Sequence, residues 1–202
     1  MDSYFDDFSR LVLVVEALKE SKKTLVKECG VGEDLTFTLF GWAGDRMVIA
    51  GQLMQNFELS KEDRIRRVLA AAIIFRTGFG CDSLTFGAEG FCVMQGSDVD
   101  SSIPLSDQFA TNPDVLECIT VLQIGKINDM AAVPYKYGIG REVVFNPVAR
   151  NPKPKSMGII YSGLVDALTF PVESKYVGDR VFVSRLVKGL QKDGFEVTRV
   201  EK

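Results

Sequence analysis

Histidine is absent from this 202-residue sequence, and its four cysteines stand apart from one another. Without histidine no Ser-His-Asp or Cys-His arrangement is available, and the commonest general base at neutral pH is missing. Cys29, Cys81, Cys92 and Cys118 form no CxxC pair, so a structural zinc site or a zinc-dependent deaminase site is not expected. We expect free thiols buried among apolar neighbours in a reducing cytoplasm, with a disulfide between two of them as the alternative.

Long apolar runs and an excess of positive charge are also missing. The longest apolar stretches, LVLVVEAL and VLAAAIIF, are far shorter than the roughly twenty residues that cross a bilayer. The acidic start MDSYFDDFSR lacks the basic region of a signal peptide. A net charge of −3 and a pI near 5.2 argue against bulk nucleic-acid binding. The composition therefore predicts a soluble, cytoplasmic protein with no membrane association.

Motifs that cradle phosphate or activate a serine are absent as well. The sequence has no GxxxxGK[ST] loop and no GxSxG elbow, and its glycine-containing stretches GWAGDR and RTGFGCDS lack the spacing of a dinucleotide fingerprint. We therefore expect no cofactor and no bound metal.

Hydrophobic periodicity predicts helices separated by groups of strands. Apolar residues at helical spacing mark the segments 4–28, 60–78 and 180–193, with Ser60 and Asp179 as N-caps and Gly78 closing the second helix. Alternation of apolar and polar residues marks a hairpin over 35–53, a strand over 83–94, a second hairpin over 116–137, a strand at REVVF and a final strand at FEVTRV. The stretch SGLVDALTF is compatible with either a short helix or a strand-like segment.

Strands in consecutive antiparallel pairs with flanking helices indicate an α+β fold rather than a doubly wound parallel sheet. A chain of this length buries roughly 70% of the surface that its unfolded form exposes, so we assign residues 1–202 to a single domain. The loop over 146–156 is basic and contains three prolines. It is predicted to lie on the surface.

Glu89 is the one acid inside the otherwise apolar strand that follows Asp82. Alternation places Glu89 on the same strand face as Thr85. A solvated or simply hydrogen-bonded carboxylate is the simplest interpretation, because buried acids are rare unless they are paired. The alternative is a buried ion pair with Arg76 or Arg141.

Carboxylates supply the remaining route to catalysis. Glu89, Glu117, Asp82 and Asp45 are candidates to gather at one end of the sheet and hold Mg²⁺, which prefers oxygen ligands. A metal nuclease that uses acids and a lysine on adjacent strands requires a lysine soon after Glu89, but the sequence continues GFCV.

The stretch YKYGIGREVVF is a candidate ligand-binding segment. Tyr135 and Tyr137 alternate onto one strand face, Gly138 and Gly140 permit a bulge or turn, and Arg141 follows. Two aromatic rings and a guanidinium are suited to stacking on a ligand. The competing interpretation is an ordinary strand turn with partly buried aromatics.

The segment EDRIRRVLAAAIIFRTGFGCDSLTFGAEGFCV, together with VPYKYGIGREVVF, resembles uncharacterised small proteins of actinobacterial bacteriophages. The similarity covers about the middle half of the chain. It implies expression in the cytoplasm of an infected bacterial cell, and it implies no catalytic residues.

These observations favour a non-enzymatic binding protein whose partner is a host or phage protein or a second copy of the chain. The candidate binding residues are Tyr135, Tyr137, Arg141, Glu89 and Arg76. Two alternatives are a carboxylate-dependent, Mg²⁺-requiring phosphoester hydrolase and a small-ligand binding domain built on the two tyrosines and Arg141.

Overall fold

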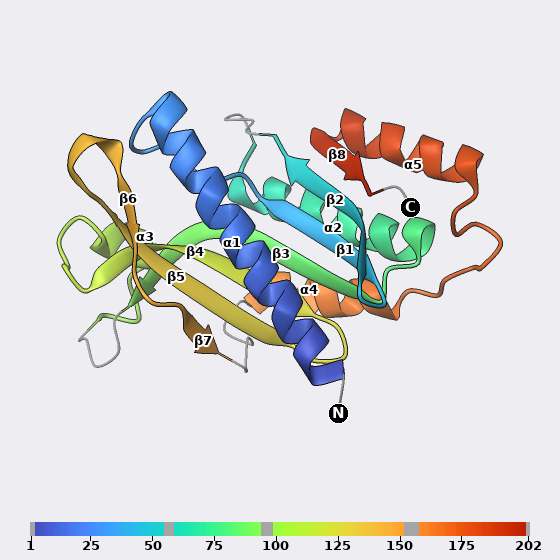
Figure 1. Ribbon diagram of the computed structural model, residues 1–202, viewed down its shortest axis with the longest axis horizontal. Helices are drawn as coiled ribbons and strands as arrows, with labels where there is room; N and C mark the ends of the chain where they lie inside the picture. Colours follow the sequence, from blue (N-terminus) through green and yellow to red (C-terminus); the bar gives the residue numbers. More distant parts are fainter. Residues whose placement is uncertain (1–2, 55–58, 94–98, 152–157, 201–202) are drawn as a thin grey trace.

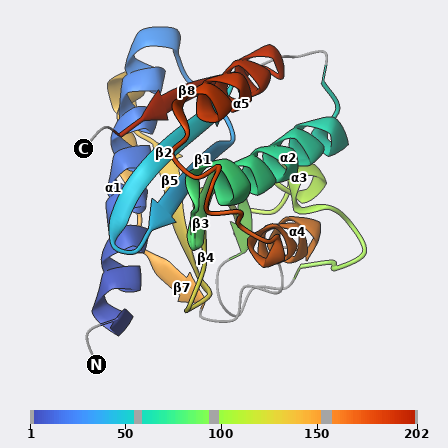
Figure 2. The same ribbon diagram turned by 90° about the vertical axis from the view of Figure 1, so that its right-hand side faces the viewer.

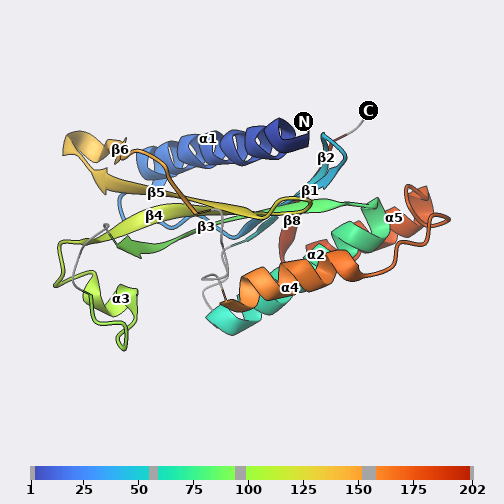
Figure 3. The ribbon, with the colours of Figure 1, turned by 90° about the horizontal axis from the view of Figure 1, so that it is seen from below.

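In the described chain, one antiparallel sheet lies between two layers of helices (Figures 1 and 3). The computed structural model describes residues 3–54, 59–93, 99–151 and 158–200. The helices are α1 (Ser3–Cys29), α2 (Lys61–Phe79), α3 (Leu105–Gln108), α4 (Gly158–Thr169) and α5 (Arg180–Lys192), with a 3₁₀ turn at Ile139–Arg141. The strands are β1 (Thr38–Ala43), β2 (Arg46–Leu53), β3 (Ser83–Val93), β4 (Val115–Ile124), β5 (Asp129–Tyr137), β6 (Val143–Phe145), β7 (Ala149–Asn151) and β8 (Phe195–Arg199).

The strand order is β6-β5-β4-β3-β1-β2-β8, and β7 also pairs with β5. All the pairs are antiparallel, which confirms the α+β prediction and both predicted hairpins. Strand β7 was not predicted, because it lies within the proline-rich loop assigned to 146–156. Residues 152–156 of that loop lie outside the described residues.

Helix α1 covers one face of the sheet, whereas α2, α4 and α5 cover the other (Figures 2 and 3). The open stretch SGLVDALTF belongs to α4, whose Leu164 and Ala167 are buried. Among the described residues, no helix combines the length and apolarity needed to cross a membrane.

Helix α2 begins and ends on side-chain and backbone caps. The Ser60 hydroxyl accepts a hydrogen bond from the Asp63 amide at 3.1 Å, as the capping pattern predicts. The predicted closure at Gly78 is wrong by two residues. Gly80 ends the helix with a φ of 69°, a left-handed conformation that glycine adopts without strain. Gly78 instead lies against Leu186, leaving no room for a Cβ.

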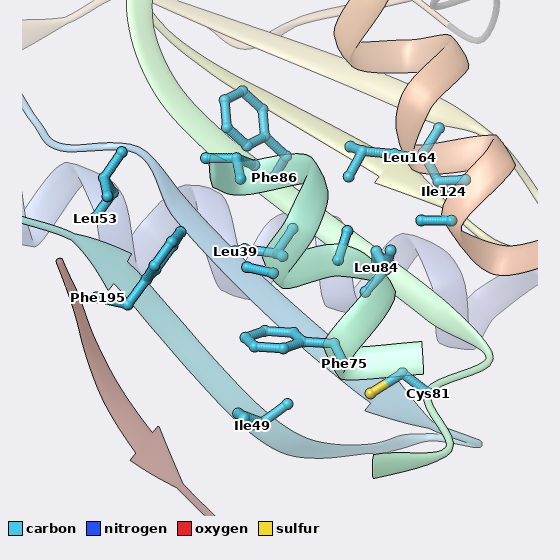
Figure 4. Packing of buried hydrophobic residues seen from close by; sticks show 14 of the residues in the cluster. Leu39, Ile49, Leu53, Phe75, Cys81, Leu84, Phe86, Ile124, Leu164 and Phe195 are labelled. Atoms are coloured by element: carbon cyan, nitrogen blue, oxygen red, sulfur yellow. The ribbon is translucent and has the colours of Figure 1, made fainter. Parts of the chain in front are cut away.

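The core between the sheet and the three-helix layer is centred on Phe75 of α2 (Figure 4). It includes Leu39, Ile49, Leu84 and Phe195 from four strands. A second core, under α1, is built from α1 side chains and from strand residues that lie mainly in β4 and β5. The sheet is therefore buried on both faces, which is why several of its strands read as nearly continuous apolar runs.

All four cysteines are free thiols, as predicted. Cys81 and Cys118 are buried, and burial raises the pKa of the Cys81 thiol to about 12. The expectation of burial is wrong for Cys29, which ends α1 in an exposed position, and Cys92 is half-buried.

Gly41 of β1 is closely packed by side chains of the core, including Phe75 of α2. A Cβ at this position would lie 2.5 Å from Cys81 Sγ and 2.9 Å from Ile49 Cγ2. We expect Gly41→Ala to lower the free energy of unfolding by about 1–3 kcal/mol through overpacking. Urea denaturation measures this, and Gly90→Ala on β3 is the matched control because nothing lies within 4 Å of a Cβ there. Equal effects of the two substitutions would contradict the packing explanation.

Candidate functional site

A cluster of ionisable side chains lies between α1 and the sheet. Its first member is a lysine on the buried side of α1. The sheet-facing side chains recur every three or four residues: Leu11, Val15, Leu18, Lys22 and Val26. Lys22 therefore occupies a position that the helical period reserves for an apolar residue. Its side chain is completely buried.

Lys22 forms an ion pair with Glu89 of β3. The ammonium lies 2.7 Å from Glu89 Oε1 and donates to the Glu33 carbonyl at 2.6 Å. The other carboxylate oxygen accepts the Leu35 amide at 2.5 Å. The pair therefore joins α1, the linker before β1, and β3. A buried charge pair is tolerated only when further hydrogen bonds complete it in this way.

Two tyrosines of β5 complete what we call the Lys22 cluster: Lys22, Glu89, Tyr135 and Tyr137. The Tyr135 hydroxyl donates to Glu89 Oε1. The Lys22 ammonium lies 5.1 Å from the Tyr135 ring centroid and 5.7 Å from that of Tyr137, within the range of cation–π attraction. The rings contact each other edge to face. The predicted shared face of the tyrosines is thus observed, but it points inward.

The cluster shifts the protonation equilibria of its members. Burial alone would lower the pKa of Lys22, but the hydrogen bond and charge of Glu89, with a smaller contribution from Tyr137, raise it above its usual value. Burial and the hydrogen bond to Glu89 raise the pKa of Tyr135 well beyond its usual value. Both groups therefore hold their protons more tightly in the folded protein than in the unfolded chain.

Glu89 is thus not solvated. It lies in a buried ion pair, as the alternative interpretation expected, but its partner is Lys22 and not Arg76 or Arg141. The face that Glu89 shares with Thr85 is covered by α1, so the polar side of β3 is buried. Arg76 instead donates to the carbonyls of Cys81 at 2.8 Å and Phe170 at 3.2 Å. Arg141 is exposed on the turn after β5, away from the inward-facing tyrosines. Tyr135, Tyr137 and Arg141 therefore do not form the predicted ligand-binding surface.

The four candidate acids separate into two groups, one at the start of β3 and one along its second half. Glu117 lies diagonally across from Glu89 on the same face of the sheet. Burial, together with the negative charges of Glu89 and Asp34, raises the pKa of Glu117, although Lys22 partly offsets this. Asp82 accepts the Gly44 amide beside Asp45, about 23 Å of extended strand away from Glu89.

The predicted gathering of all four acids at one end is therefore wrong. Within the described residues, no group of three or more His, Cys, Asp or Glu side chains is arranged to hold a metal ion. The lysine missing after Glu89 is supplied by α1, but Lys22 and both oxygens of Glu89 are engaged in internal contacts. The Lys22 cluster is therefore suited to fixing α1 onto the sheet.

A second candidate site lies on the other side of the sheet, at the end where α5 begins. We call it the arginine groove and define it by Arg46, Arg180 and Arg199. These residues line a cavity of about 870 Å³ whose other walls are mostly apolar. Sequence reasoning missed it, because its arginines come from the start of β2, the first turn of α5 and the end of β8.

Comparison with known proteins gives this site no precedent: no protein family, curated protein or solved structure matches the chain.

The first prediction from the Lys22 cluster concerns its contribution to stability. Glu89→Gln leaves Lys22 buried without a counter-charge, so we expect a loss of about 3–5 kcal/mol in the free energy of unfolding. Combining it with Lys22→Met removes both charges and should recover most of that loss. Glu20→Gln, which breaks an exposed pair with Lys23, is the control and should cost about 1 kcal/mol or less. Equal losses for Glu89→Gln and the control would contradict the role of the pair.

The second prediction concerns alkaline pH. The folded-state pKa values of Lys22 and Tyr135 lie above their unfolded values of 10.5 and 10.0. Their stabilisation is complete below the unfolded values and is lost as pH rises toward the folded ones. We expect the free energy of unfolding to fall above about pH 10, by about 1.4 kcal/mol per pH unit for each group. Urea unfolding of Tyr135→Phe should show a shallower decline, whereas a control at the exposed Tyr176, Tyr176→Phe, should match the unmodified protein. Identical slopes for all three would contradict this assignment.

Proposed function

We propose that the protein is a non-catalytic binding protein and that it contacts an anionic group of its ligand or partner in the arginine groove. One observation carries this proposal. Three exposed arginine residues from separate elements line one cavity, although the chain as a whole carries a net charge of −3. Within the described parts of the chain, none of the three forms an ion pair.

The chemistry of arginine favours this interpretation over a merely solvated surface. A guanidinium group presents a planar fork of donors that matches carboxylate and phosphate oxygens. Three such groups around one cavity attract an anion more strongly than a single arginine does. All three side chains are exposed, so salt screens this attraction.

The alternative, a magnesium-dependent hydrolase, has less support. Its four candidate acids lie in two separate groups, and the carboxylate of Glu89 is committed to internal partners. The partner classes expected from the sequence, a host or phage protein or a second copy of the chain, stay predictions. The resemblance to actinobacteriophage proteins has the same standing.

The proposal is tested with two anionic probes, inorganic pyrophosphate and a labelled hexaglutamate peptide. We expect at least one to bind, with an affinity that falls as salt is added. Calorimetry and fluorescence anisotropy measure the binding, and chromatography should recover the probe unchanged with and without Mg²⁺.

The double variant Arg180→Gln/Arg199→Gln should lose the binding. The control is Arg66→Gln, since the Arg66 side chain is 79% exposed on α2 and does not line the groove. Release of phosphate from pyrophosphate, or failure of every anionic probe to bind, would overturn the proposal.

A further inference from the structure

The arginine groove has a defined geometry that narrows the class of its ligand. A bulge in β2 determines where one of its arginines points. Trp42 pairs with Met47 and Gly41 pairs with Ile49, so Val48 has no partner on β1. An extra residue of this kind changes the alternation of the strand. Val48 consequently packs on the same core as Ile49. Arg46, two residues before Val48, therefore lies on the same face of the sheet, the one covered by α2, α4 and α5.

Arg199 reaches the same side from the neighbouring strand. It pairs with Ile49 in the register of β2 and β8, and directly paired residues share a face of the sheet. Arg180 lies opposite, in the first turn of α5, which packs beside β8 (Figure 2). The three cations therefore surround the cavity from two strands and one helix.

Two acids adjoin arginines of the groove in the sequence, Asp179 before Arg180 and Asp45 before Arg46. Asp179 is the N-cap of α5, and its carboxylate accepts the Phe182 amide at 2.7 Å. Neither acid lines the cavity. The first-turn amides of α5 add partial positive charge on the side of Arg180. The groove thus offers about three positive charges to one compact anionic group.

The size and lining of the cavity indicate that the ligand also has an apolar body. A volume of about 870 Å³ falls at the upper end of small-molecule sites and far exceeds the space of an inorganic anion. Phe79 and Val177 supply an aromatic ring and aliphatic surface beside the cations, whereas Val183 is 1% exposed. Carboxylates each carry a single charge, whereas one phosphate chain concentrates several charges at one end of a molecule.

The groove is held in place by contacts that do not involve a ligand. Val177 packs against Gly80, where a Cβ would lie 3.1 Å from Val177 Cγ1. The rings of Tyr176 and Phe182 stack with centroids 4.8 Å apart. These contacts fix the segment before α5 against the end of α2. A site formed in advance loses less conformational entropy when it binds.

We propose that the arginine groove binds a soluble organic phosphate with more than one phosphoryl charge and an apolar or aromatic body, of the nucleoside di- or triphosphate class. Arg46, Arg180 and Arg199 hold the phosphates, and the body lies on Phe79 and Val177. This inference rests on the proposed function of the groove as an anion-binding site.

The test is calorimetry on the full chain with adenosine triphosphate, adenosine, inorganic pyrophosphate and hexaglutamate. We expect the triphosphate to bind with a Kd below about 1 mM. Pyrophosphate should bind about tenfold or more weakly because it lacks the apolar body, and adenosine should not bind measurably because it lacks charge. Vesicles of phosphatidylcholine with phosphatidic acid separate a lipid phosphate from a soluble one and should not bind.

Variants separate the two parts of the site. Arg180→Gln and Arg199→Gln should each weaken the triphosphate about tenfold or more. Val177→Ser should weaken the triphosphate more than pyrophosphate, and Arg66→Gln should change neither. Circular dichroism and melting curves confirm that each variant is folded.

The outcomes distinguish failure of this inference from failure of the proposed function. Binding of hexaglutamate alone, or of the lipid vesicles alone, would overturn the organic phosphate while the groove remained an anion site. Failure of every anionic probe would overturn both. Triphosphate binding that is unchanged in Arg180→Gln and Arg199→Gln would place the ligand elsewhere and overturn the assignment of the groove.

Discussion

The ion pair between Lys22 and Glu89 is the interaction on which the arrangement of the α1 side depends. A charged lysine under a helix is stable only where a carboxylate meets it, and that carboxylate also accepts from the linker to β1 and from Tyr135. The pair therefore fixes the position of α1 and the path of the chain into β1, and it links β3 to β5 across β4. A shift of α1 by one turn would bury both charges without partners.

Helix α1 and strand β3 run in the same direction with matching intervals. Arg10 donates to Ser83 at 3.0 Å near one end, and Lys22 meets Glu89 near the other. Twelve residues of helix span about 18 Å, and six residues of strand span about 20 Å. Polar contacts thus set the register of α1 within an otherwise apolar core, whereas the opposite face is packed by the apolar core around Phe75 (Figure 4).

Several features were predictable because their causes are local. The capping of α2 by Ser60 follows from residues three apart, and the shared face of Glu89 and Thr85 follows from strand alternation. The burial of that face was not predictable from β3 alone, because it depends on a helix far away in sequence. The one available signal was Lys22 itself, a cation within the apolar stripe of α1. The arginine groove depends on a bulge in β2 and on the pairing of β2 with β8, and neither is visible in the local pattern.

Strand β8 forms an outer edge of the sheet, yet it pairs with β2 from the first half of the chain, with Leu53 opposite Phe195. Contacts so distant in sequence close large loops and are slow to form, and they require most of the chain to have been synthesised. Until then β2 presents an unpaired, partly apolar edge of the kind that invites aggregation. Ribosome-bound intermediates of this protein should accordingly be those most in need of a chaperone, and maturation of the groove should be among the last events of its biogenesis.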